Sequence, residues 1–187
     1  GGENLVNFYQ QINSLEMPLA VSVYFKSLGA IFFQSNIIAG FLIAAGLLLY
    51  SRIAFTLSLL GFFTGYMFYN FIGGNFSDLL YSNIGFNFIL SAIAIGGFFT
   101  IPSPLSYLLV IIITPLTGII SSALGNFLDV FQLPMYSLPF NIIVIFTLAV
   151  LKFRTSFGKL EMVLSQQFSP EKNLYKHKNR LERFKND

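Results

Sequence analysis

Residues 84–124 read IGFNFILSAIAIGGFFTIPSPLSYLLVIIITPLTGIISSAL and contain no Asp, Glu, Lys or Arg. Two apolar runs, Ile84–Ile101 and Leu105–Leu124, flank the short sequence Pro102-Ser103-Pro104. A helix needs about 20 mostly apolar residues to cross a hydrocarbon core of about 30 Å, and each run is close to that length. Lipid offers no partner to backbone polar groups, which favours helices. The stretch therefore predicts two membrane helices joined by a proline-rich turn.

The sequence on either side of this stretch is also poor in charge. Hydrophobic residues make up 55% of the chain and charged residues 10%, whereas a soluble domain carries about 25% charged residues. Between Val21 and Leu151 the sequence has four charged side chains, Lys26, Arg52, Asp78 and Asp129. The last 36 residues hold nine of the eleven basic groups, so the net charge of +3 belongs to the tail and indicates no nucleic-acid partner. The composition predicts an all-α integral membrane protein embedded in a lipid bilayer.

Four further apolar segments complete the predicted membrane domain. Ile53–Gly73 and Tyr136–Leu151 are read as spans, whereas Leu19–Phe33 and Ile37–Tyr50 are short and are separated by Gln34-Ser35-Asn36. These two short segments are either a broken or re-entrant pair or one long tilted helix. We therefore expect about five membrane-spanning or half-spanning helices.

The chain accordingly divides into three predicted parts: an N-terminal interfacial segment over residues 1–19, a membrane domain over 20–151, and a basic soluble tail or linker over 152–187. Asn4–Ser14 has apolar residues at helical spacing and is expected to form the interfacial helix. Gly61 and Gly65 form a GxxxG pair, which suits close packing of one membrane helix on another.

The sequence does not favour catalysis. It contains no cysteine, and it shows no nucleophile–base pair, metal cluster or phosphate-binding loop. His177, the single histidine, stands among lysines without evident partner ligands. We expect no enzyme activity, no cofactor and no metal site.

Three polar islands interrupt the apolar body, and each needs a reason because buried polar groups are costly in lipid. They are FFQSNIIAG at 32–40, IGFNFIL at 84–90 and LPMYSLPFN at 133–141. Their order and spacing resemble the urea transporter family, whose repeat carries N-P-x-x-G, G-F-N-G-x-L and L-P-x-x-T-x-P-F elements. The third island is the most specific match, with Ser137 where the family usually has Thr. The resemblance runs from about Phe25 to Leu151, which is one family repeat.

This resemblance implies a multi-pass protein of the inner (plasma) membrane that forms half of an inverted-repeat channel. Family members place their pore between two inverted repeats, so we expect a second repeat or partner subunit and further homo-oligomers, trimers especially. By position the chain looks like the second repeat of a bacterial member. It opens with Gly1-Gly2 rather than Met, so we expect it to be a piece of a longer polypeptide. Leu164–Phe184 resembles the connector that precedes a cell-wall peptidase domain in some relatives.

The resemblance also assigns residues to the pore. Phe33, Phe86 and Leu90 would form a flat apolar slot, Ser137 would supply the mid-pore hydroxyl, and Asn36 and Asn87 would hold the ends of broken helices. Three positions depart from the family pattern: Ala30 replaces a Gln or Glu acceptor, Ile37 replaces a proline, and Phe88 replaces a glycine. Loss of the acceptor weakens a urea-specific site, and a bulky Phe88 is expected to narrow the slot.

Three functions remain open at this point. The first is passive transport of urea or a similar small neutral amide by a channel half-unit. The second is a non-transporting membrane anchor or scaffold for an attached extracytoplasmic domain. The third is a membrane subunit of a redox pump, for which no flavin-attachment threonine or quinone site is evident. Whichever function applies, Pro134 and Pro139 predict a helix break across Leu133–Asn141.

Overall fold

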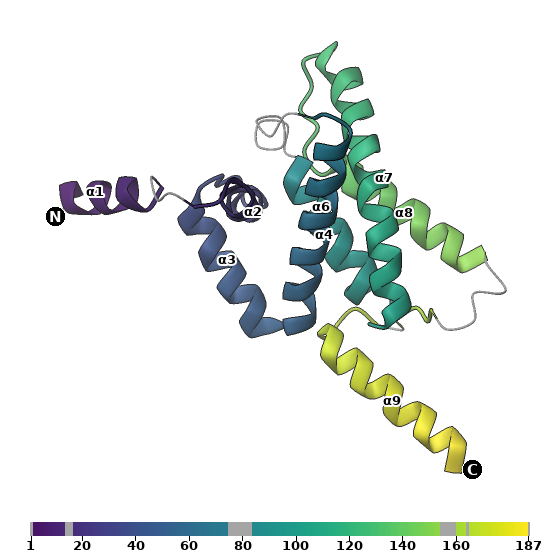
Figure 1. The fold of residues 1–187 in the computed structure, drawn as a ribbon. Coiled ribbons are helices and arrows are strands. Elements are labelled where there is room, and N and C mark those ends of the chain that lie inside the picture. The colour runs from purple at the N-terminus through teal and green to yellow at the C-terminus, as the bar shows by residue number, and fades with distance from the viewer. Residues whose placement is uncertain (1, 14–16, 75–83, 154–159, 164, 187) are drawn as a thin grey trace.

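The computed structural model describes residues 2–13, 17–74, 84–153, 160–163 and 165–186. Asp78 and residues 154–159 and 164 of the predicted tail lie outside the described residues. Within the described ranges the chain is all-α, as predicted, with an isolated backbone bridge between Thr100 and Met162. The helices are α1 (Gly2–Asn13), α2 (Leu19–Ala30), α3 (Ile37–Tyr50), α4 (Arg52–Phe71), α6 (Ile84–Ile93), the π-helix η1 (Ala94–Phe98), α7 (Pro104–Asp129), α8 (Leu138–Phe153) and α9 (Pro170–Asn186) (Figure 1).

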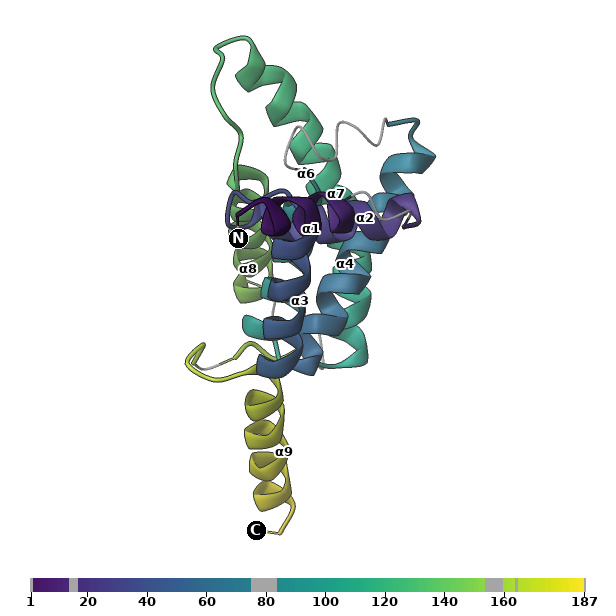
Figure 2. The same cartoon turned by 90° about the vertical axis from the view of Figure 1, so that its left-hand side faces the viewer.

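Two of these helices, α4 and α7, are long and apolar enough to cross a membrane. Four shorter apolar helices accompany them within the described residues, namely α2, α3, α6 continued by η1, and α8. The structure resolves the question left open at Gln34–Asn36, because α2 and α3 are two separate helices and not one tilted helix. Figure 2 shows α1 and α2 running across the direction of α3 and α4. The interfacial position of α1 stays a prediction, but its helical conformation is confirmed.

Helices α2 and α3, which lie before and after the Gln34–Asn36 break, pack closely on each other. A Cβ atom added at Gly40 of α3 would lie 1.8 Å from the carbonyl oxygen of Phe25 in α2. Only glycine allows the two backbones this approach. Asn36 supplies the N-cap of α3, because its Oδ1 accepts a hydrogen bond of 2.8 Å from the Ala39 N–H. The start of α3 is therefore specified both by its cap and by its neighbour.

A buried core cluster joins α2, α4 and α6, and α7 packs against α6 beside it. Gly61 and Gly65 both face α6, where added Cβ atoms would come within 2.2 Å of Ala92 Cβ and 2.4 Å of the Phe88 ring. The predicted GxxxG contact is thus confirmed. The Phe88 ring is fully buried and also approaches Gly118 of α7. Glycines on two neighbouring helices make room for the Phe88 ring in the core of the single chain, and its effect on the slot stays a prediction.

The predicted span Ile84–Ile101 changes character halfway along. It is α-helical to Ile93 and continues as the π-helix η1, after which residues 99–103 are not helical. The glycines of η1 fit under apolar side chains, with an added Cβ at Gly96 meeting Leu57 at 2.5 Å. Helix α7 then begins with a capping box formed by Ser103 and Ser106. The proline-rich turn expected between the two spans is therefore confirmed.

Where the structure describes it, the tail contacts the bundle. Helix α9 extends away from the bundle, but its first turn is attached to the start of α4 (Figure 1). His177 also has a neighbour that the sequence did not reveal, because its Nδ1 lies 3.1 Å from Oε2 of Glu161. This contact pairs the imidazole with a single carboxylate.

Candidate functional site

The first polar island ends α2 in a Schellman motif. The Gln34 N–H donates to the Gly29 carbonyl and the Phe33 N–H donates to the Ala30 carbonyl, both at 3.0 Å. The residue at the left-handed position of this motif is normally glycine, but here it is Phe33, with φ of 60°. Phe33 is 76% exposed, so burial of its ring within the chain does not explain why it occupies a strained position.

The third polar island is a break between α7 and α8, as predicted. Helix α7 ends at Asp129 and α8 begins at Leu138, with no helix between them. The break opens with a second Schellman motif, in which Gln132 is the left-handed residue with φ of 54°. Tyr136 also has a positive φ, of 42°. The break thus holds two side-chain-bearing residues in a backbone conformation that disfavours them.

Asn87, in the second island, holds this break from a different helix. Its side chain is fully buried, its Nδ2 donates to the Tyr136 carbonyl at 2.9 Å, and its Oδ1 accepts from the Phe140 N–H at 3.1 Å. One amide therefore satisfies a carbonyl of the break and a free N–H at the start of α8. The Asn87 side chain therefore finds hydrogen-bond partners within the same chain.

The first island reaches the third through two aromatic rings. Phe33 and Tyr136 lie edge to face, with ring centroids 5.7 Å apart and an interplanar angle of 88°. Both residues have positive φ, so two strained positions meet at this contact. With Asn87 joining the second island to the third, the fold brings all three polar islands together.

Ser137 and Asn141 are two polar residues at the surface of the third island. The Asn141 Nδ2 donates to the Ser137 carbonyl at 2.9 Å and lies 3.4 Å from the Ser137 hydroxyl. Ser137 is partly exposed just before α8, and Asn141 is exposed on the first turn of α8, where the other exposed side chains of the helix are mostly apolar. The predicted pore hydroxyl is therefore accessible at the surface of the single chain. Sequence reasoning did not select Tyr136 or Asn141 as site residues, although both stand within the third island.

The two remaining slot residues, Phe86 and Leu90, are less exposed to solvent than Phe33. Phe86 is 6% exposed, whereas Phe33 is 76% exposed, so the two rings do not share one open surface in the single chain. Leu90, one helical turn beyond Phe86, is half-buried and lines a separate hollow with Phe140 of α8. A slot built jointly by Phe33, Phe86 and Leu90 remains a prediction for a larger assembly.

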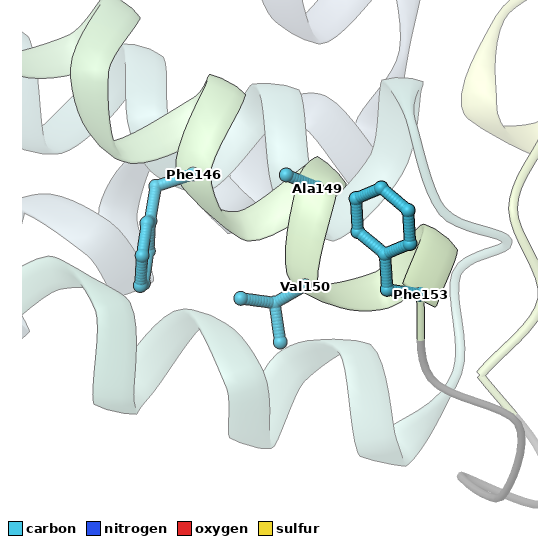
Figure 3. A pocket seen from close by; sticks show the side chains of 4 residues that line it. All are labelled: Phe146, Ala149, Val150 and Phe153. Atoms are coloured by element: carbon cyan, nitrogen blue, oxygen red, sulfur yellow. The ribbon is translucent and has the colours of Figure 1, made fainter.

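A second apolar hollow lies on the outward face of α8, and its lining has no polar or ionisable side chain. Figure 3 shows its lining side chains, Phe146, Ala149, Val150 and Phe153, all from one helix. Such an open apolar face is typical of a helix in contact with lipid. Across the described part of the chain, no group of three or more His, Cys, Asp or Glu side chains is placed to hold a metal ion.

Comparison with protein families gives one match. The family model described as urea transporter matches residues 3–152, which spans every helix from α1 to α8 except the last residue of α8 and, at the N-terminus, Gly2. All three polar islands fall within the matched range. No curated protein matches the chain.

Proposed function

Since the chain belongs to the urea transporter family, a family of membrane channels and transporters and not of enzymes, we propose that it is one half of a passive channel for urea or a similar small neutral amide. In this proposal the chain resides in the inner (plasma) membrane as a multi-pass protein. Its pore lies between this repeat and a second one in inverted orientation.

The convergence of the three polar islands carries this proposal. Asn87 ties the second island to the third by two hydrogen bonds, and the Phe33 ring ties the first to the third. Polar groups within an apolar membrane body are costly unless they serve one another or a path for substrate. Their arrangement at a single region of the fold supports a path that passes along it.

The proposed chemistry follows from the shape of urea, which is flat, neutral and rich in hydrogen-bonding groups at its edges. Aromatic and branched side chains contact its faces, the role proposed for Phe33, Phe86 and Leu90. The Ser137 hydroxyl, paired with the Asn141 amide, supplies hydrogen bonds to its edges. Asn36 and Asn87 keep the helix ends around the path in place.

Pairing with a second repeat explains why this surface is left open. Asn141 and the strained Phe33 are exposed on the single chain and Ser137 is partly exposed, and lipid cannot satisfy the polar groups. A second repeat facing them would cover these groups and complete the path. That partner is an upstream part of the same polypeptide, a separate subunit or an inverted copy. Assembly of paired units into homo-oligomers, trimers by family resemblance, is proposed on top of this pairing.

Urea flux into proteoliposomes tests the proposal. The 187-residue chain held as a monomer should pass little urea, while the paired form should pass it by a saturable route. In the paired form, Phe86→Ala should lower the flux about fivefold, the effect of losing an aromatic contact worth about 1 kcal/mol. Phe146→Ala is the matched control, because this ring is 63% exposed on the outward face of α8 and should leave flux unchanged.

Two outcomes would contradict the proposal. Fast urea flux through monomers of the chain would show that one repeat is sufficient. A paired form that carries no urea would favour the anchor or scaffold function instead.

A further inference from the structure

A hollow of about 280 Å³ lies between α6, η1, α8 and the tail. We call it the tail-side hollow. Its walls include Leu90 of α6, Phe98 of η1, the following Phe99, and Phe140 of α8. These side chains are all half-buried, so their free surfaces face the open space. Small-molecule sites commonly have mostly apolar and aromatic walls with a few polar groups, and this hollow has the size for a small ligand.

Gln166 supplies the polar side chain among the described residues that line the tail-side hollow. It comes from the tail, far in sequence from the other walls, and it is exposed. A glutamine amide carries both a carbonyl acceptor and an NH₂ donor. These are the complements of the NH₂ and carbonyl groups of urea and of related planar amides.

Backbone hydrogen bonds hold the tail beside this hollow. The Ile101 N–H donates to the Glu161 carbonyl at 2.8 Å, and the Val163 N–H donates to the Phe99 carbonyl at 2.9 Å. The second bond involves Phe99, which is itself a wall of the hollow. These two bonds hold Glu161 and Val163, which precede Gln166 in the tail, beside the segment after η1.

Glu171 fixes the tail from the other side. Its Oε1 accepts hydrogen bonds of 2.9 Å from the Ser51 hydroxyl and from the Ile53 N–H at the start of α4. Burial by itself would raise the pKa of the Glu171 carboxyl. The hydrogen bonds from Ile53, from its own backbone, from Ser51 and from Ser169 outweigh that effect and lower the pKa below its usual value. The carboxylate is thus ionised at neutral pH, as a cap on a helix N-terminus requires.

From these contacts we propose that the tail-side hollow is a binding site for urea or a similar planar amide, with Gln166 as its hydrogen-bonding residue. The ligand lies with its faces against Phe98, Phe99 and Phe140 and its edge toward the Gln166 amide. Leu90 belongs both to this hollow and to the proposed slot, so the hollow forms the end of the path on the side of the tail. This inference rests on the proposed function, which supplies the substrate class. It adds the tail as a working part of the transport site.

The flux test compares two neighbouring glutamines in the paired form. Gln166→Leu should raise the half-saturating urea concentration about fivefold, the effect of losing one ordinary hydrogen bond. Gln167→Leu is the matched control, since Gln167 is exposed but does not line the hollow. Glu171→Ala releases the tail from α4 and should reproduce the Gln166→Leu shift. Identical saturation curves for Gln166→Leu and Gln167→Leu would overturn the proposal.

A binding measurement separates this inference from the proposed function, because the whole hollow lies within one chain. In the isotopically labelled 187-residue protein in micelles, urea should shift the Gln166 side-chain amide signals saturably and the Gln167 signals only linearly. A linear response at both residues would overturn the site even if the paired form conducts urea. A saturable response at Gln166 would support the site even if the paired form conducts none.

Discussion

The two helix breaks of the molecule begin alike and end differently. Residues 31–36 separate α2 from α3, and residues 130–137 separate α7 from α8. Each opens with a Schellman motif whose left-handed residue carries a side chain, Phe33 in the first break and Gln132 in the second. The next helix is then capped by Asn36 from within the first break, but by Asn87 from another helix in the second.

The cap of α3 is therefore local in sequence, whereas the cap of α8 depends on tertiary structure. The asparagine of the first break caps the helix that it directly precedes, as N-cap residues ordinarily do. The second break receives its amide from α6, 49 residues away from Tyr136 along the chain. Loss of tertiary packing would therefore leave the first cap intact and remove the second. The second break thus depends on the arrangement of α6 against α8, which also places the proposed slot residues.

The largest effect on the free energy of unfolding is expected at the close contact between α2 and α3, on either side of the first break. Gly40→Ala would put a Cβ atom 1.8 Å from the Phe25 carbonyl oxygen, which a backbone atom cannot easily avoid. We expect it to lower the free energy of unfolding by about 3 kcal/mol, as in severe overpacking. Gly46→Ala on the same helix has no atom within 4 Å and should raise it by about 0.5 kcal/mol. Unfolding in mixed micelles measures both, and equal effects would contradict the tight contact.

The two caps should differ in their cost. Asn87→Leu leaves the Tyr136 carbonyl and the Phe140 N–H without their amide partner and should cost about 2 kcal/mol of unfolding free energy. Asn36→Ala removes a single N-cap bond and should cost about 1 kcal/mol. The same unfolding assay compares them. If Asn36→Ala proves the more damaging, then the second break does not rely on Asn87 as its hydrogen bonds indicate.

The smallest effects should come from the two left-handed positions. Gln132→Gly relieves backbone strain and should stabilise the protein by about 1 kcal/mol. Phe33→Gly relieves the same strain but loses the ring contact with Tyr136, so the two effects should cancel to within about 1 kcal/mol. Flux distinguishes them further, because Phe33→Gly should reduce urea transport in the paired form whereas Gln132→Gly should not. Equal flux in both variants would remove Phe33 from the proposed path.

Part of the candidate site was predictable from the sequence. The pattern Pro134–Pro139 predicted the second break because proline lacks a donor and restricts the preceding residue. Asn36 stands immediately before an apolar run, the usual place of an N-cap. The partners of Asn87 and the ring contact of Phe33 were not predictable, since hydrogen bonds and ring contacts between distant segments leave no periodic signal in one sequence.

The sequence by itself determined that the body is helical and built for lipid. Apolar runs of spanning length with few charges leave the backbone no other way to satisfy its hydrogen bonds. The tertiary structure decided which face each side chain occupies. Phe86 and Phe88 stand two residues apart on α6 and are both buried, but it is the Phe88 ring that packs between Gly65 and Gly118, a placement that depends on where neighbouring helices carry glycine. The tertiary structure also decided where the tail attaches. The Glu171 carboxylate accepts a hydrogen bond from the Ile53 N–H at the start of α4, and these two residues are 118 positions apart in the sequence.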